Sequence, residues 1–151
     1  MPMIVKTIQV LVHAEHETLW NVLMDRLENP GRYLPGVSEV RILERSEGEL
    51  LREMKLHGEL VKERILVKPH DSELHHELLE HPQFTGLVVT KIVRTAVQSP
   101  VAPQYLECDL NLQTKSFKVE GALKGEDEIM ADLKSEMIKM KSRAEEMDGR
   151  A

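Results

Sequence analysis

The chain has 151 residues, of which 41% are hydrophobic and 30% charged, and this composition predicts one globular domain spanning residues 1–151. The net charge of −6 disfavours a nucleic acid as partner, because affinity for nucleic acid depends mainly on Lys and Arg neutralising phosphates. Since no apolar run reaches the roughly 20 residues that span a bilayer, we expect no stable membrane insertion.

The first predicted elements are one strand and one amphipathic helix. Residues 3–12 are rich in β-branched side chains and place apolar residues on one face, which is typical of a strand. Within 15–28, apolar residues recur at spacings of three and four, which predicts a helix. The Asn-Pro-Gly sequence at 29–31 ends this helix, and Pro-Gly at 35–36 leaves room for a short helix or turn between the two breaks.

Six further strands are predicted in the middle of the chain. Gly48 and the His57-Gly58 pair mark tight turns that separate the first three of them. The stretch 73–80 contains Glu and Leu, which favour helix, but its short length between breakers fits a strand better. The predicted strands are 37–45, 49–57, 59–68, 73–80, 84–97 and 105–113.

The segment 127–148 returns to the period of a helix. Its apolar residues form a narrow seam with three- and four-residue spacing: Met130, Leu133, Met137, Met140, Ala144 and Met147. Such a seam also suits a dimeric coiled coil, so both a monomer and a homodimer remain open. Packing against the sheet is favoured, because an uncovered sheet face would expose a large apolar patch.

One long helix is available to cover the apolar face of seven strands. A sheet can wrap a single helix only by strong curvature, which twist, bulges and glycines supply. Because the helix seam carries methionines and no aromatic residues, we expect a hollow between sheet and helix, although methionine also fills gaps in ordinary cores.

The order of elements resembles the helix-grip fold of the START-like (SRPBCC) superfamily, which includes birch-pollen-allergen-like proteins, lipid-transfer domains and polyketide cyclases. The segment Leu19-Trp20-Asn21-Val22-Leu23 and the break at Asn29-Pro30 support the likeness. Leu51-Arg52-Glu53 and Val61-Lys62-Glu63-Arg64 look like the small AtaL-like subgroup. The resemblance implies an α+β fold: a curved seven-stranded antiparallel sheet around a long C-terminal helix, with two short helices between strands 1 and 2. It also implies an internal cavity for a small hydrophobic molecule, but carries over no catalytic residue.

Two charged residues fall on the apolar face of the hairpin at 49–68. If His57-Gly58 is a two-residue turn, Arg52 faces Glu63 directly. A charge among apolar neighbours must be paired or reach a wet cavity. Arg52 is therefore either a polar anchor that offers donors to a ligand carboxylate or carbonyl, or half of a structural ion pair.

The predicted cavity wall combines this pair with apolar residues of the strands and the terminal helix. Cys108 lies on the dry face of its strand, and we expect a buried thiol because no activating base is visible. As the only cysteine, it cannot form an internal disulfide, which favours the cytoplasm. The wall is predicted to contain Arg52, Glu63, Met54, Val61, Ile65, Leu106, Cys108, Leu110, Met130, Leu133, Met137 and Met140.

The seven histidines do not predict a metal centre. His76 and His81 are one residue too far apart for the zincin spacing, and His13 and His16 lack a third ligand. We therefore expect histidines at the solvated surface, and neither a metal nor a cofactor.

Three functions follow as hypotheses. The leading one is the binding of a small hydrophobic or amphipathic ligand in the cavity. The second is an enzyme of the cyclase or hydro-lyase type, with Arg52 polarising a carbonyl of a polyketide-like substrate; Glu63 is the only inward titratable group expected, and Arg52 should lower its pKa away from neutrality. The third is a protein-interaction domain.

Overall fold

The structure is a computed structural model that describes the backbone of residues 3–95, 103–115 and 119–149, and their side chains outside 119–124. The elements are β1 (Met3–Val12), α1 (His16–Glu28), η1 (Pro30–Arg32), β2 (Val37–Ser46), β3 (Glu49–Leu56), β4 (Glu59–Lys68), η2 (Pro69–Asp71), β5 (Glu73–Glu80), β6 (Phe84–Arg94), β7 (Gln104–Thr114) and α2 (Val119–Met147).

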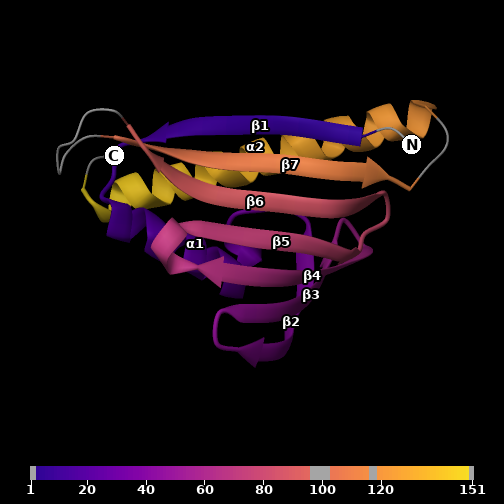
Figure 1. Cartoon of the computed structure of the whole chain (residues 1–151), viewed down its shortest axis with the longest axis horizontal. Coiled ribbons are helices and arrows are strands. Elements are labelled where there is room, and N and C mark those ends of the chain that lie inside the picture. Colours follow the sequence, from indigo (N-terminus) through magenta and orange to yellow (C-terminus); the bar gives the residue numbers. More distant parts are fainter. Residues whose placement is uncertain (1–2, 96–102, 116–118, 150–151) are drawn as a thin grey trace.

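All seven strands form one antiparallel sheet in the order β1-β7-β6-β5-β4-β3-β2. The sheet curves, with α2 behind β1, β7 and β6 and the short α1 behind the lower strands (Figure 1). The predicted helix-grip fold is confirmed, including two short helices, α1 and η1, between the first two strands.

The β3–β4 hairpin has the predicted register. His57 and Gly58 form its turn with φ of 52° and 81°, the pair of positive values that a tight hairpin turn uses. Arg52 consequently lies opposite Glu63. The stretch 73–80 is a strand as predicted, because its neighbours β4 and β6 supply hydrogen-bonding partners on both sides.

Bulges and one glycine bend the sheet. The β2–β3 ladder shifts register after Ser38 and again after Ile42. On β6, Gly86 has a φ of 128°, and a Cβ there would lie 2.3 Å from the carbonyl oxygen of Asn111, so β6 and β7 approach closely only with glycine at this position. β6 ends at Arg94, and positions 96 and 97 of the predicted strand lie outside the described residues.

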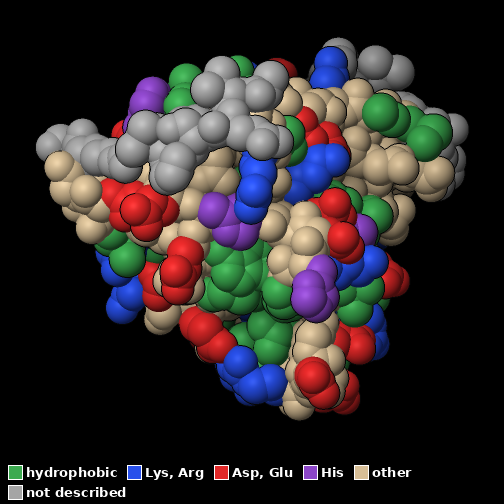
Figure 2. Space-filling model, turned by 60° about the vertical axis from the view of Figure 1, so that its left-hand side comes forward, with side chains coloured by type: hydrophobic (Ala, Val, Ile, Leu, Met, Phe, Trp, Pro, Cys, Tyr) green, Lys and Arg blue, Asp and Glu red, His purple; other side chains and the backbone are tan. Residues whose placement is uncertain are grey.

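The face of the molecule in Figure 2 carries hydrophobic side chains near its middle, bordered by histidines and by charged groups of both signs. Among the exposed large hydrophobic residues are Leu60, Leu66 and Leu79 of β4 and β5. None of the helices in the described ranges is long and apolar enough to cross a membrane.

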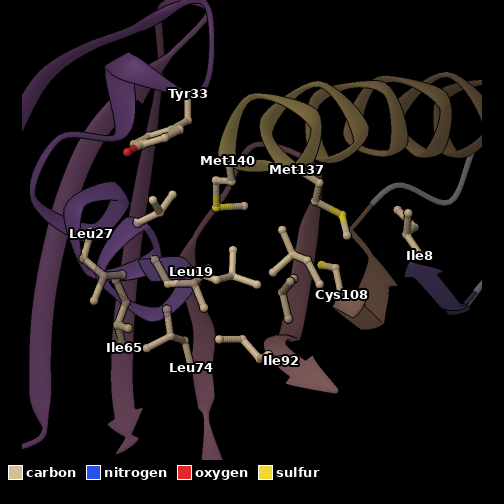
Figure 3. Packing of buried hydrophobic residues seen from close by; sticks show 14 of the residues in the cluster. Ile8, Leu19, Leu27, Tyr33, Ile65, Leu74, Ile92, Cys108, Met137 and Met140 are labelled. Atoms are coloured by element: carbon tan, nitrogen blue, oxygen red, sulfur yellow. The ribbon is translucent and has the colours of Figure 1, made fainter. Parts of the chain in front are cut away.

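Helix α2 begins eight residues before the predicted start at 127, although glycines at 121 and 125 lower the helix propensity there. Met137, Met140 and Ala144 are fully buried, while Met147 at the end is 57% exposed. Figure 3 shows Met137 and Met140 pointing from α2 toward the side chains of the core, among them Leu19 and Cys108. The C-terminal half of the seam therefore packs within the chain, with little space left between helix and sheet.

Candidate functional site

A pocket of about 140 Å³ lies between strands β3 to β6 and the N-terminal half of α2. Roughly this volume accommodates a single benzene ring in a protein interior. Nine of the 21 lining residues are apolar and most of the lining surface is apolar, which suits a small hydrophobic group. The apolar lining consists of Leu34, Met54, Leu56, Val61, Leu78, Pro82, Val88, Ile129 and Leu133.

The exposed part of the lining forms the mouth of the pocket. It combines the β3–β4 turn, the β5–β6 turn and α2. Glu59 and Glu128 are both exposed there. His57 Nε2 lies 3.4 Å from Asp132 Oδ2, so this contact links the hairpin turn to α2 across the mouth.

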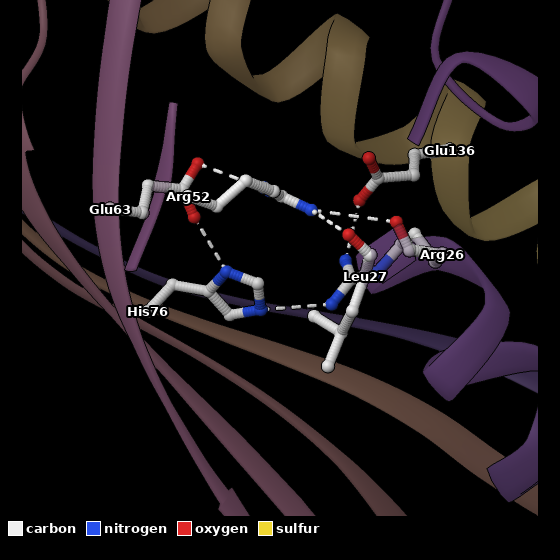
Figure 4. Close-up of polar contacts among 6 residues, drawn as sticks. All are labelled: Arg26, Leu27, Arg52, Glu63, His76 and Glu136. Atoms are coloured by element: carbon white, nitrogen blue, oxygen red, sulfur yellow. Dashed lines mark hydrogen bonds and ion pairs between the residues drawn. The ribbon is translucent and has the colours of Figure 1, made fainter. Parts of the chain in front are cut away.

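Five polar side chains meet at the inner end of the pocket (Figure 4). They come from five different elements: Arg26 from α1, Arg52 from β3, Glu63 from β4, His76 from β5 and Glu136 from α2. Each residue is at most 9% exposed. A charged cluster this deeply buried requires that its members pair with one another.

The contacts form a continuous chain. Arg26 Nη1 donates to Glu136 Oε1 at 2.6 Å, and Arg26 Nη2 lies 2.9 Å from His76 Nε2. His76 Nδ1 lies 2.6 Å from Glu63 Oε2. Arg52 Nη2 donates to Glu63 Oε1 at 3.5 Å, and Arg52 Nη1 donates to the carbonyl oxygen of Leu27 at 3.2 Å.

Arg52 also stabilises the end of α1. Its Nη1 donates to the carbonyl oxygens of Arg26 and Leu27, in the last turn of the helix. Carbonyls in this turn lack partners within the helix and carry the negative end of the helix dipole. One guanidinium thus joins the β3–β4 hairpin to α1.

The neighbours of His76 determine its protonation state. A guanidinium only donates, so His76 Nε2 must accept from Arg26, and the proton on Nδ1 is donated to Glu63. Burial lowers the pKa of His76, and the charges of Arg26 and Arg52 lower it further. The hydrogen bond to Glu63 and the charge of Glu63 raise this pKa, but the net shift is downward. The imidazole is therefore neutral near pH 7.

Glu63 is ionised. Burial alone would raise its pKa, but the charge of Arg52, the hydrogen bond from His76 and the charge of Arg26 hold the pKa far below its usual range. With His76 neutral, the two guanidinium groups balance the carboxylates of Glu63 and Glu136, so the buried cluster carries no net charge.

Five of the residues predicted for the cavity wall line this pocket: Arg52, Met54, Val61, Glu63 and Leu133. The other seven do not line it and instead belong to the hydrophobic core or pack against it: Ile65, Leu106, Cys108, Leu110, Met130, Met137 and Met140. The C-terminal half of α2 packs on the core, and this pocket lies at the turn end of β3 to β6. Burial raises the pKa of the Cys108 thiol to about 12, and the predicted burial of this residue is confirmed.

Two expectations about polar residues are wrong. His76 is not solvated, and Glu63 is not the only titratable group that faces inward. The alternation in β5 places His76 between Leu74 and Leu78 on the inner face, a signal that the sequence did contain. Arg26 likewise follows Leu23 at the spacing of three that marks the apolar side of α1.

Several other histidines serve in separate local contacts. His16 Nε2 lies 2.7 Å from Ser72 Oγ, and His13 Nδ1 lies 3.6 Å from Glu145 Oε2. In the portion of the chain that the structure describes, no three His, Cys, Asp or Glu side chains are grouped in a way that could hold a metal ion.

A curved sheet around a long C-terminal helix, with a pocket between them, defines the helix-grip class of START-like proteins. Within that class, the chain belongs to the AtaL family: the family model, described as acetylaranotin biosynthesis cluster protein L, matches residues 8–97. A search of curated proteins found no match.

Solved structures with the same fold include aromatase/cyclases and a START superfamily protein. The Zhui aromatase/cyclase from Streptomyces sp. R1128 is 17% identical with a TM-score of 0.70, and the match covers 99% of this chain and 95% of that one. A START superfamily protein from Mycobacterium smegmatis is 20% identical with a TM-score of 0.65, covering 96% and 98%. The di-domain ARO/CYC StfQ from the steffimycin biosynthetic pathway is 15% identical with a TM-score of 0.78; the match covers 97% of this chain but 52% of StfQ.

Proposed function

We propose that this protein binds a small, largely apolar molecule in the pocket between the sheet and α2. The observation that carries the proposal is an apolar pocket whose inner end is closed by a neutral, fully buried cluster of charged groups. Pockets lined mainly by apolar side chains, with a few polar groups at one end, are the usual form of small-molecule sites. The shared fold with an aromatase/cyclase and a START superfamily protein supports the proposal by analogy.

The contacts of the cluster favour binding over catalysis. A general base needs a pKa near the working pH and a free position toward the substrate. Both ring nitrogens of His76 and both carboxylate oxygens of Glu63 already have partners, and the pKa of Glu63 lies far from neutrality. The cyclase or hydro-lyase hypothesis is supported by a neutral imidazole in the pocket lining, but it requires the Arg26–His76 contact to open first.

The remaining alternative is a protein-interaction domain, which the exposed leucines of β4 and β5 support. Ligand binding is favoured because the pocket is built from buried residues of five elements. We further infer that the partner is a small molecule and not a nucleic acid, since the chain carries a net charge of −6. A cytoplasmic location is also part of the proposal, and the single cysteine, which cannot form an internal disulfide, supports it.

A matched pair of helix variants tests the proposal. Leu133 and Met130 are both half-buried on α2, but only Leu133 lines the pocket. With 4-phenylbutan-1-ol as a neutral probe, followed by NMR chemical-shift titration, Leu133→Trp should weaken binding at least tenfold, since it fills the pocket. Met130→Trp should change binding less than twofold. Absence of binding to the wild-type protein, or equal losses in both variants, would contradict the proposal.

A further inference from the structure

We infer that the pocket selects by charge: it takes apolar molecules that are neutral or carry an amine at the mouth, and rejects the matching carboxylates. This inference rests on the proposed binding function and names the class of ligand that binds. It depends on the balance of charged groups around the pocket, where five carboxylates and two guanidinium groups line the wall.

The two positive charges are already neutralised inside the cluster. Arg26 is paired with Glu136 at 2.6 Å, and Arg52 with Glu63 at 3.5 Å. Arg52 Nη1 further donates to the carbonyl oxygens of Arg26 and Leu27 at the end of α1. The charges of both guanidinium groups are therefore balanced inside the cluster, although the Nε atoms of Arg26 and Arg52 are buried without a hydrogen-bond partner among the described residues. The cluster as a whole offers no net positive charge to a ligand carboxylate.

The negative charges at the mouth are not neutralised in the same way. Among the described residues, the one ion-pair partner of Asp132 is His57, while Glu59 and Glu128 form no ion pair there. Lys115 Nζ donates to the carbonyl oxygen of His81 at 2.8 Å, but Lys115 does not line the pocket.

An anionic ligand would thus lose hydration on entering and face three carboxylates at the mouth. An ammonium group on a short chain would instead lie among those carboxylates while its apolar part occupies the pocket. Because this part of the wall is exposed, solvent partly screens the effect, and we expect a difference in affinity on the order of tenfold.

Three probes that share one phenyl ring and one chain length test this inference: 4-phenylbutylamine, 4-phenylbutan-1-ol and 4-phenylbutanoate. At pH 7, NMR titrations should give the amine at least tenfold tighter binding than the carboxylate, with the alcohol between them. Raising the salt concentration to 0.5 M should narrow the difference, because salt screens exposed charges.

In the double variant Glu59→Gln/Glu128→Gln, the affinities for the amine and the carboxylate should differ by no more than about threefold. The affinity for the alcohol should be unchanged. Glu47→Gln/Glu146→Gln, which removes two exposed carboxylates outside the lining, should retain the full difference. If no probe binds, the proposed function itself fails. If the carboxylate binds as tightly as the amine, or the difference persists in Glu59→Gln/Glu128→Gln, the pocket binds ligands but its mouth does not select by charge.

Discussion

Arg26 of α1 and His76 of β5 are 50 positions apart in the chain and meet at 2.9 Å in the interior, where the guanidinium donates and the imidazole accepts. This contact joins two halves of the buried cluster, Glu136–Arg26 and Glu63–Arg52. In each pair the arginine neutralises the charge of the glutamate. Loss of a single member would leave a buried charge without its partner, so we expect it to lower the stability of the fold strongly.

Removing one member of the Arg26–Glu136 pair should be strongly destabilising. Arg26→Met leaves the Glu136 carboxylate buried without its cation, and we expect a loss of about 3–5 kcal/mol in the free energy of unfolding, measured by urea titration. The double variant Arg26→Met/Glu136→Met should recover most of that loss, because no unpaired charge remains. Equal destabilisation by the single and double variants would show that the pairing is not what matters at this site.

Stability should fall as the pH drops below about 6.5. Burial lowers the pKa values of His76, His81 and His16 in the folded state, so the unfolded chain binds more protons than the folded chain in this range. Each histidine makes its full contribution to the free energy of unfolding at a pH above its pKa in the unfolded chain. This contribution is lost as the pH falls toward its lower pKa in the folded protein. Each histidine changes the free energy of unfolding by at most about 1.4 kcal/mol per pH unit.

His76→Gln should flatten this dependence between pH 6.5 and 5, while the exposed His70→Gln should leave it unchanged. A second loss is expected below about pH 4.5, because Glu63 is ionised in the folded state far below its unfolded pKa. Urea titrations at half-unit pH steps measure both effects. An unaltered slope in His76→Gln would mean that the buried imidazole does not titrate as inferred.

The thiol of Cys108 should be unreactive in the folded protein. It is 1% exposed and its pKa is raised to about 12 by burial, so little thiolate is present at pH 8. We expect a thiol-specific disulfide reagent to label the native protein at least 100-fold more slowly than the protein in 6 M guanidinium chloride. Rapid labelling of the native form would require that β7 opens readily to solvent.

Gly86→Ala should destabilise the sheet more than Gly58→Ala. Both glycines have positive φ: at Gly58 the φ of 81° costs an alanine about 1–2 kcal/mol, and at Gly86 the φ of 128° falls in a region that essentially only glycine adopts. At Gly86, the added Cβ would also meet Asn111 at 2.3 Å, whereas at Gly58 nothing lies within 4 Å. Urea unfolding should therefore show an additional loss of at least about 1 kcal/mol in Gly86→Ala from overpacking; equal losses would indicate that β6 and β7 separate at no cost.

The sequence by itself determined the local structure of this protein. The side-chain pattern predicts the strands and both α-helices, with segment length deciding 73–80, although α2 begins eight residues before its predicted start. A two-residue turn at His57-Gly58 is enough to place Arg52 opposite Glu63, because register in a hairpin follows from the turn. The apolar alternation around Cys108 likewise predicts its burial. These features depend on neighbours within a few residues or across one turn.

The site depended on the tertiary structure. Arg26, His76 and Glu136 belong to three elements, and only the curvature of the sheet and the position of α2 bring them to the same point as Glu63. The same packing decided where the hollow lies: the C-terminal half of α2 closes against the sheet, and the N-terminal half leaves the pocket. Periodicity specifies which face of an element is buried, but the distance between two packed elements follows from how all their side chains fit together.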